Sequence, residues 1–334
     1  MHSLRKPYLI FLGDVALTSD AKTGFGLRDW CGDSVIGEWA LPAATVSLGL
    51  AKLSPEQAAK QGAGSLVIGV AAVGGQLPAA WLPTLEQALD AGLDIVSGLH
   101  TRLESQPTLA AAAARSGARL INVRHSDRAF PTGSGVRRSG VRVLTVGTDC
   151  ALGKKYTALA LTRALLRLGA KASFRATGQT GIMIAGQGIA IDAVVADFIA
   201  GAAEELSPDN APDHWDVIEG QGALFHPAYA GVTLGLIHGS QPDAIVLCHD
   251  PSRQTIEGYP HIPLPPLAEA IRRYVEAARL TNRATRCVGV AINSSSLDDA
   301  AWHSYRQAVA DDLGIPVCDP MRGGVEAIAQ ALLA

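Results

Sequence analysis

Short apolar runs recur along the first part of the chain, and Ala-rich helical stretches separate them. The runs read PYLIFLGD, SLVIGVA, GLDIVSGL and ARLINVRH, at residues 7–14, 65–71, 92–99 and 118–125. Helical patterns include residues 84–91 and 109–114. Alternation of buried strands with helices predicts a parallel sheet that carries helices on both faces.

The same alternation returns after a segment of different composition. Residues 130–140, FPTGSGVRRSG, are dense in Gly, Ser and Arg, which is typical of a linker. Further short strand-like runs, most of them rich in Val and Ile, begin at residue 141 and continue at 171–175, 215–219, 243–247, 287–293 and 315–318. The pattern therefore predicts two α/β domains, residues 1–138 and 139–334. In open parallel sheets ligands bind at the carboxyl ends of the strands, so the residues just after these runs are the candidates for chemistry.

Composition narrows the class of protein. The 334 residues are 48% hydrophobic, 18% charged and 5% aromatic, which fits a compact α/β protein rather than a disordered one. A formal net charge of −3 indicates no excess of basic residues for binding nucleic acid or an anionic membrane, so small molecules are the expected partners. Apolar surface shared between subunits would make the protein a homo-oligomer.

No membrane span or exported form is expected. The longest weakly polar run, residues 66–82, is interrupted by Gly and Pro, and the N-terminal apolar stretch reads as a first strand rather than a signal peptide. The five cysteines contain no CxxC pair, which suits a reducing cytoplasm and predicts no zinc site.

The most informative segment is VRVLTVGTDCALGKKYTALA, residues 141–160. A β-branched strand leads into a loop with Gly147 and Gly153, and Lys154 opens a helical pattern, which is the order of a phosphate-binding loop. Two features depart from the usual pattern. Five residues rather than four separate the glycines, and Lys155 stands in place of the Mg²⁺-binding Ser/Thr, with Thr157 two residues too late. These departures weaken the case for Mg·ATP hydrolysis or phosphoryl transfer, and no metal is firmly predicted.

Two loops that follow later strands carry further candidate residues. The segment RATGQTGIMIAGQG, residues 175–188, can line a site that binds an anion or an acyl carbonyl. An ordinary Gly/Thr turn is the alternative. The stretch after it places Asp192 and Asp197 among apolar residues, facing either the site or solvent. Glu219 ends a strand as a Walker B carboxylate does, and either Glu219 or His226 can act on a water or an amine. A structural role is the alternative for His226.

Two further groups stand at strand ends. Asn293 is predicted to lie beside a nucleotide base. In the N-terminal half a set of cations suits the binding of carboxylates, with inter-subunit salt bridges as the alternative. These cations are Lys22, His100, Arg102, Arg124 and His125.

Taken together, these segments resemble the D-glutamate N-acetyltransferase family over about residues 7–322. The segments that carry the resemblance are GDVALTSDAKTGFGL (13–27), LVIGVAAVGGQLP (66–78), GLDIVSGLHTRL (92–103), VGTDCALGKKYTALAL (146–161), FRATGQTGI (174–182), DHWDVIEGQGALFHP (213–227) and PDAIVLCHDPSR (242–253). The resemblance implies a Rossmann-like N-terminal domain and a P-loop NTPase-like C-terminal domain. It also implies transfer of acetyl from acetyl-CoA to the amino group of D-glutamate. Lys155 departs from the family, where an uncharged residue such as Met is expected.

On this resemblance the candidate residues take specific roles. A CoA phosphate would lie against Gly147, Thr148, Asp149, Gly153, Lys154, Lys155 and Tyr156, with Asn293 near the adenine. Glu219 or His226 would take the proton of the attacking amine, and donors within residues 175–180 would stabilise the oxyanion. The substrate would be bound by Lys22, Arg124, Arg175, Gln179 and Thr180.

Two other functions remain open from the residues alone. One is an ATP-dependent ligase or kinase like dethiobiotin synthetase, which GTDCALGK favours and Lys155 opposes. The other is a non-catalytic nucleotide sensor.

Overall fold

The computed structural model describes residues 4–18, 20–70, 75–125 and 129–334, and it divides into two compact units. The first unit comprises residues 1–128 together with 178–193, and the second comprises residues 129–177 and 194–334. The chain thus returns to the first unit for one short segment before it completes the second. Residues 19 and 71–74, which belong to the sequence motifs above, lie outside the described residues, as do residues 126–128; residue 71 is the last residue of the predicted 65–71 strand.

The first unit is built on a parallel sheet with strand order β2-β1-β3-β4-β5. Its strands are β1 (Tyr8–Phe11), β2 (Val35–Trp39), β3 (Ser65–Ile68), β4 (Asp94–Ser97) and β5 (Leu120–Asn122). Four of them coincide with the predicted apolar runs, because β1, β3 and β4 are buried along their whole length and β5 over most of it. β2, at the edge, was not predicted, since only two of its five residues are fully buried.

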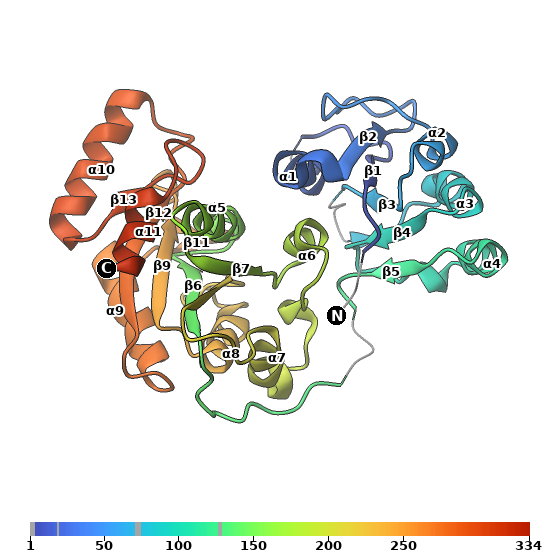
Figure 1. Ribbon diagram of the computed structural model, residues 1–334. Coiled ribbons are helices and arrows are strands. Elements are labelled where there is room, and N and C mark those ends of the chain that lie inside the picture. Colours follow the sequence, from blue (N-terminus) through green and yellow to red (C-terminus); the bar gives the residue numbers. More distant parts are fainter. Residues whose placement is uncertain (1–3, 19, 71–74, 126–128) are drawn as a thin grey trace. The chain divides into compact units, whose positions relative to one another are not determined.

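Helices cover both faces of this sheet, as predicted (Figure 1). On one face lie α2 (Pro55–Lys60), α3 (Leu82–Asp90) and α4 (Pro107–Ser116). The other face carries α1 (Lys22–Cys31) and α6 (Gln179–Ala185), which pack against each other. Helix α6 comes from the part of the sequence predicted to belong to the second domain, so the first unit is completed by a distant segment.

The second unit contains a six-stranded parallel sheet of order β13-β12-β9-β6-β8-β7. Its strands are β6 (Val141–Gly147), β7 (Lys171–Arg175), β8 (His214–Ile218), β9 (Ala244–His249), β12 (Arg286–Ile292) and β13 (Val317–Cys318). Each of them overlaps a predicted run. The two-stranded antiparallel hairpin of β10 (Thr255–Ile256) and β11 (Tyr259–Pro263) was not predicted. Its short strands lack a continuous apolar pattern.

Six helices of the second unit flank this sheet. They are α5 (Lys154–Arg167), α7 (Ile199–Leu206), α8 (Ala230–Ser240), α9 (Leu267–Arg279), α10 (Asp299–Leu313) and α11 (Glu326–Leu333). Within the ranges that the structure describes, no helix combines the length and apolar content that crossing a bilayer requires.

The segment expected to be a linker, residues 130–140, is fastened to the second unit. The backbone N–H groups of Ser134 and Gly135 each donate to the Glu204 carboxylate at 2.9 Å. The Arg138 guanidinium donates to the carbonyl oxygens of Ser207 and Gly239 at 2.8 and 2.7 Å. The predicted boundary after residue 138 therefore differs from the structural division, which falls after residue 128. The Gly, Ser and Arg content that suggested a free linker supplies backbone and guanidinium donors that attach the segment.

Close packing of α7 against α8 leads to a stability prediction. A Cβ atom on Gly239 would lie 2.1 Å from the carbonyl oxygen of Ala200, so the two helices would have to separate. We expect Gly239→Ala to lower the free energy of unfolding by about 1–3 kcal/mol, measured by urea denaturation. Gly231→Ala in the same helix is the matched control, because nothing lies within 4 Å of the added atom. It should be neutral or stabilising by up to about 1 kcal/mol. Equal destabilisation by both changes would contradict the packing argument.

Candidate functional site

The predicted phosphate-binding loop follows the central strand of the second sheet. Strand β6 lies between β9 and β8 and ends at Gly147, and α5 begins at Lys154. Ala151 and Gly153 have φ angles of 54° and 100°, so the loop turns twice through the left-handed region before the helix starts. Gly153 tolerates that angle because it has no Cβ. The strand, loop and helix predicted from the sequence are therefore all present.

Lys154 is buried inside the loop, with 7% of its surface exposed. Its Nζ donates to the Asp149 carbonyl oxygen at 2.8 Å, and it forms no ion pair with a carboxylate of the described residues. Burial lowers the pKa of Lys154 below its ordinary value, because the ammonium group loses water without gaining an anion. A negatively charged group bound at the loop would supply that missing partner.

Asp149 shapes the loop from within. It is fully buried, and its carboxylate accepts hydrogen bonds from the backbone N–H groups of Cys150 and Glu257 and from the Arg253 guanidinium, at 2.7, 2.8 and 2.9 Å. All these donors come from the loop itself or from the segment around β10. Asp149 therefore supports the loop structurally, and its predicted contact with a ligand stays a prediction.

Two other distant side chains hold the loop. The Thr148 hydroxyl is hydrogen bonded to His249 Nδ1 at 2.9 Å, and the Tyr274 hydroxyl donates to the Gly147 carbonyl oxygen at 2.8 Å. Sequence reasoning singled out none of Arg253, His249 and Tyr274. The segment PDAIVLCHDPSR was noted for its resemblance to the family, and no local signal connects it to the loop about 100 residues earlier.

Lys155 occupies the position where a metal-binding hydroxyl is usual. Its Nζ lies 4.4 Å from the ring centroid of Tyr156, at the distance of a cation–π contact. The positive charge of Lys155 repels a divalent metal ion and therefore disfavours metal binding beside it. Both residues are half-buried at the start of α5.

Glu219 lies where the sequence predicted it, directly after β8 and next to the loop strand. It is 3% exposed, and its Oε2 accepts a hydrogen bond from the Thr177 backbone N–H at 2.9 Å. The Thr177 hydroxyl donates to the Glu219 carbonyl oxygen at 2.7 Å. Gly220 then leaves space for Lys154, since a Cβ there would lie 3.0 Å from Lys154 Cδ and 1.8 Å from the Thr145 carbonyl oxygen. The acid is held rigidly at the carboxyl edge of the sheet.

His226 is also buried, at 3% exposure, and it is packed between two aromatic rings. Its ring lies 4.5 Å from that of Tyr229 and 5.2 Å from that of Tyr259, measured between centroids. Its Nδ1 accepts a hydrogen bond from the Ala228 backbone N–H at 3.2 Å. The neutral ring therefore carries its hydrogen on Nε2, which makes that nitrogen a donor.

Asp149, Cys150 and His226 bring one carboxylate oxygen, one sulfur and one ring nitrogen within 4.8 Å of one another. These atoms can reach a common metal ion. However, Arg253 is paired with the Asp149 carboxylate, and burial raises the pKa of the Cys150 thiol, which favours its neutral form. Both features oppose a cation, so the cluster suits hydrogen bonding to a ligand better than metal binding.

Two other predicted residues are engaged by protein groups. Asn293 Nδ2 donates to the Asp250 carboxylate at 3.0 Å, and its Oδ1 accepts from the Ser295 backbone N–H at 3.3 Å. Arg175, at the end of β7, forms an ion pair with the buried Asp216 at 2.8 Å. Arg175 therefore joins β7 to β8, and its guanidinium is only partly available to a substrate.

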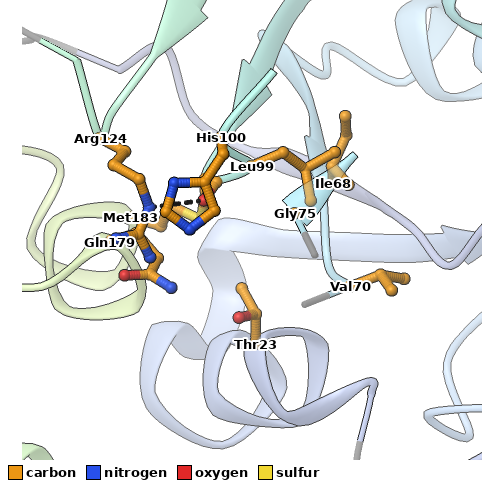
Figure 2. A pocket seen from close by; sticks show the side chains of 10 residues that line it. Thr23, Ile68, Val70, Gly75, Leu99, His100, Arg124, Gln179 and Met183 are labelled. Carbon is orange, nitrogen blue, oxygen red and sulfur yellow. Dashed lines mark hydrogen bonds between the residues drawn. The ribbon is translucent and has the colours of Figure 1, made fainter. Parts of the chain in front are cut away.

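The remaining predicted substrate residues belong to the first unit, where a pocket of about 200 Å³ lies. Arg124 and Gln179 line this pocket, together with Thr23 and His100 (Figure 2). Thr180 stands behind Thr23, and their hydroxyl oxygens are 3.0 Å apart.

Lys22 is exposed at the start of α1, and its side chain does not line this pocket. The sequence grouped Lys22, Arg124 and Arg175 by charge alone. The structure brings together a different set around Arg124.

Fold and site together define a two-domain α/β protein whose second domain carries a P-loop without the usual metal-binding hydroxyl. Two family models match the chain: DUF1611_N, a Rossmann-like domain of unknown function, at residues 37–126, and DUF1611, a P-loop domain of unknown function, at residues 130–329. The chain belongs to the DUF1611 family.

Characterised relatives extend over nearly the whole chain. A D-glutamate N-acetyltransferase of Tritonibacter scottomollicae is 45% identical over 331 residues, 99% of both chains. A second protein of that name, from a Pseudoalteromonas species, is 44% identical over 98% of this chain and 99% of its own. The crystal structure of a DUF1611 family protein from Anabaena variabilis superimposes with a TM-score of 0.87 at 35% identity, over 98% of this chain and 99% of that one. The family relation and the fold expected from the sequence are thus confirmed.

Proposed function

We propose that the protein is an acyltransferase that moves acetyl from acetyl-CoA to the amino group of D-glutamate, giving N-acetyl-D-glutamate and CoA. The name of the two relatives supports the reaction, since they match the chain from end to end. The observation on this chain that supports the donor is Lys154, a buried ammonium group without a carboxylate partner among the described residues. CoA phosphates can be bound there without Mg²⁺, in keeping with Lys155 at the metal position.

In this reaction a C–N bond forms at the thioester carbonyl and the C–S bond breaks. The attacking ammonium must first lose a proton, because it has no lone pair, and the departing CoA thiolate takes one up. We propose Glu219 as the base, since neutral His226 has its proton on Nε2 and its Nδ1 already accepts a hydrogen bond. His226 Nε2–H is instead a candidate donor to the oxyanion.

A thiol-release assay tests the proposed reaction directly. We expect CoA to appear when the protein is given acetyl-CoA with D-glutamate, and little to appear with L-glutamate or without an amino acid. Mass spectrometry should find the acetylated amino acid in equal amount. Absence of transfer to every D- and L-amino acid tried would refute the proposal.

The alternative, an ATP-dependent ligase or kinase, is distinguished by ligand binding. Thermal unfolding in the presence of CoA, acetyl-CoA and ATP with Mg²⁺ ranks the ligands, because a ligand that binds only the folded state raises the melting temperature. Stabilisation by ATP with Mg²⁺ alone would favour the alternative. A cytoplasmic location and a homo-oligomer remain predictions from the sequence.

A further inference from the structure

The pocket of the first unit lies where ligands bind in open parallel sheets. In the strand order β2-β1-β3-β4-β5 the chain leaves β1 toward one edge of the sheet and returns on the other side of it at β3. A crevice forms at the carboxyl ends of the strands at such a switch point. The pocket is lined there by Thr23 from α1, by Ile68 at the end of β3 and by Gly98 after β4.

Its size and lining select a small, polar ligand with an apolar part. A volume of about 200 Å³ is below the roughly 300–1,000 Å³ of pockets that hold drug-sized ligands or cofactors. The imidazole of His100, the guanidinium of Arg124 and the amide of Gln179 lie close together, and the Thr23 hydroxyl faces them from α1 (Figure 2). Val70 and Met183 contribute apolar surface.

Arg124 is the fixed positive charge of this pocket. Its Nε donates to the Gly98 carbonyl oxygen at 3.2 Å and its Nη1 to the Asp192 carboxylate at 2.6 Å, which sets the plane of the guanidinium. An arginine has five N–H donors, so a group oriented by two bonds retains others for a ligand. A guanidinium held in this way is suited to a carboxylate, which it binds through two parallel hydrogen bonds.

The glycines around the pocket keep it open. A Cβ on Gly75 would lie 2.2 Å from His100 Cδ2, and one on Gly98 would lie 2.9 Å from Gln179 Cγ. Gly75 also has a φ angle of 63°, which disfavours any other residue. Larger residues at either position would displace the polar side chains that face the cavity.

Helix α6 forms one wall and is firmly attached to the first unit. The Tyr8 hydroxyl donates to the Met183 carbonyl oxygen at 3.1 Å, and Lys6 Nζ donates to that of Ile184 at 3.2 Å. In the sequence, α6 begins two residues after Thr177, whose backbone N–H donates to Glu219.

We propose that this pocket binds the amino-acid substrate, a short-chain amino dicarboxylate, with Arg124 paired to one of its carboxylates. Gln179, His100 and Thr23 hydrogen bond its other polar groups, and the apolar residues contact its methylene groups. Asp192 is a positioning residue that orients Arg124. The inference rests on the proposed function only for the identity of the ligand.

Calorimetric titration of the full-length protein with D-glutamate tests this site without turnover, with and without CoA present. We expect Arg124→Met to weaken D-glutamate binding by roughly tenfold or more, because a charge-assisted bidentate contact is lost. Arg124→Lys keeps the charge but not the two parallel hydrogen bonds, so its affinity for D-glutamate should lie between those of the unmodified protein and Arg124→Met. Arg115→Met, which removes an equally charged residue that is 60% exposed on α4, should leave the affinity unchanged.

The outcomes separate this inference from the proposed function. D-glutamate affinity that is unchanged in Arg124→Met and Arg124→Lys, with or without CoA, would overturn the proposal that this pocket binds the substrate, even if acetyl transfer occurs. Binding that depends on Arg124 without any acetyl transfer would support the pocket and refute the proposed function. Circular dichroism and the melting temperature of each variant show whether a loss of binding is a loss of folding.

Discussion

Lys154→Ala is expected to weaken CoA binding by roughly 10- to 150-fold, the loss that follows when one hydrogen bond to a charged group is removed. The effect follows from the position of Nζ, which lies inside the loop on the Asp149 carbonyl oxygen and has no carboxylate partner among the described residues. A CoA phosphate would provide the missing negative charge. Calorimetric titration with CoA and with acetyl-CoA measures the change.

The same substitution should not unfold the protein. Burial lowers the pKa of Lys154, so in the absence of ligand the charged form is less stable in the folded chain than in the unfolded chain. That cost is complete below the folded pKa of Lys154 and disappears as the pH rises to the unfolded pKa, so at neutral pH the melting temperature of Lys154→Ala should stay the same or rise. Lys171→Ala is the matched control, because Lys171 is 65% exposed and pairs with Asp213 on the surface. CoA affinity that is equal in both variants would place the phosphate elsewhere.

The sheets could be predicted from the sequence because their strands are buried continuously. β1, β3, β4 and β9 are buried along their whole length, and helices separate them, so the parallel arrangement follows from the pattern. The phosphate loop could be predicted for a related reason. Its glycines and Lys154 lie within one short segment of the sequence, and the conformation depends mainly on these neighbours.

The surroundings of the loop depend on contacts that no local pattern encodes. Arg253 reaches Asp149 across 104 positions, and Tyr274 reaches Gly147 across 127. The tautomer of the neutral His226 ring is another example. Its Nδ1 accepts from Ala228 two residues later, and this depends on the turn geometry rather than on residue type.

Charge type alone does not distinguish between the two arginines predicted to bind the substrate. Arg124 and Arg175 both follow strands and both looked suited to carboxylates, yet their surroundings differ. Arg175 pairs with Asp216, which is 2% exposed, so its charge is neutralised inside the protein. Arg124 pairs with Asp192, which is 32% exposed, at the edge of a cavity. The burial of the paired acids distinguishes the two arginines, and these long-range pairs have no local signal in the sequence.

The second large effect is expected for Glu219→Gln, which should lower kcat by roughly 10²- to 10⁴-fold, the usual contribution of a general base. Glutamine keeps an acceptor oxygen for the Thr177 N–H, so the loop that leads to α6 should remain in place. It cannot take a proton from the substrate ammonium. We therefore expect the affinities for CoA and D-glutamate and the melting temperature to stay close to those of the unmodified protein while turnover falls.

A structural role for Glu219 would give a different result. In that case Glu219→Ala, which removes the acceptor as well, would lower the melting temperature and the activity together, while Glu219→Gln would retain activity. Should Glu219→Gln turn over normally, His226→Asn becomes the decisive variant, since the asparagine oxygen can replace Nδ1 as acceptor from Ala228 but supplies neither a base nor the Nε2–H donor.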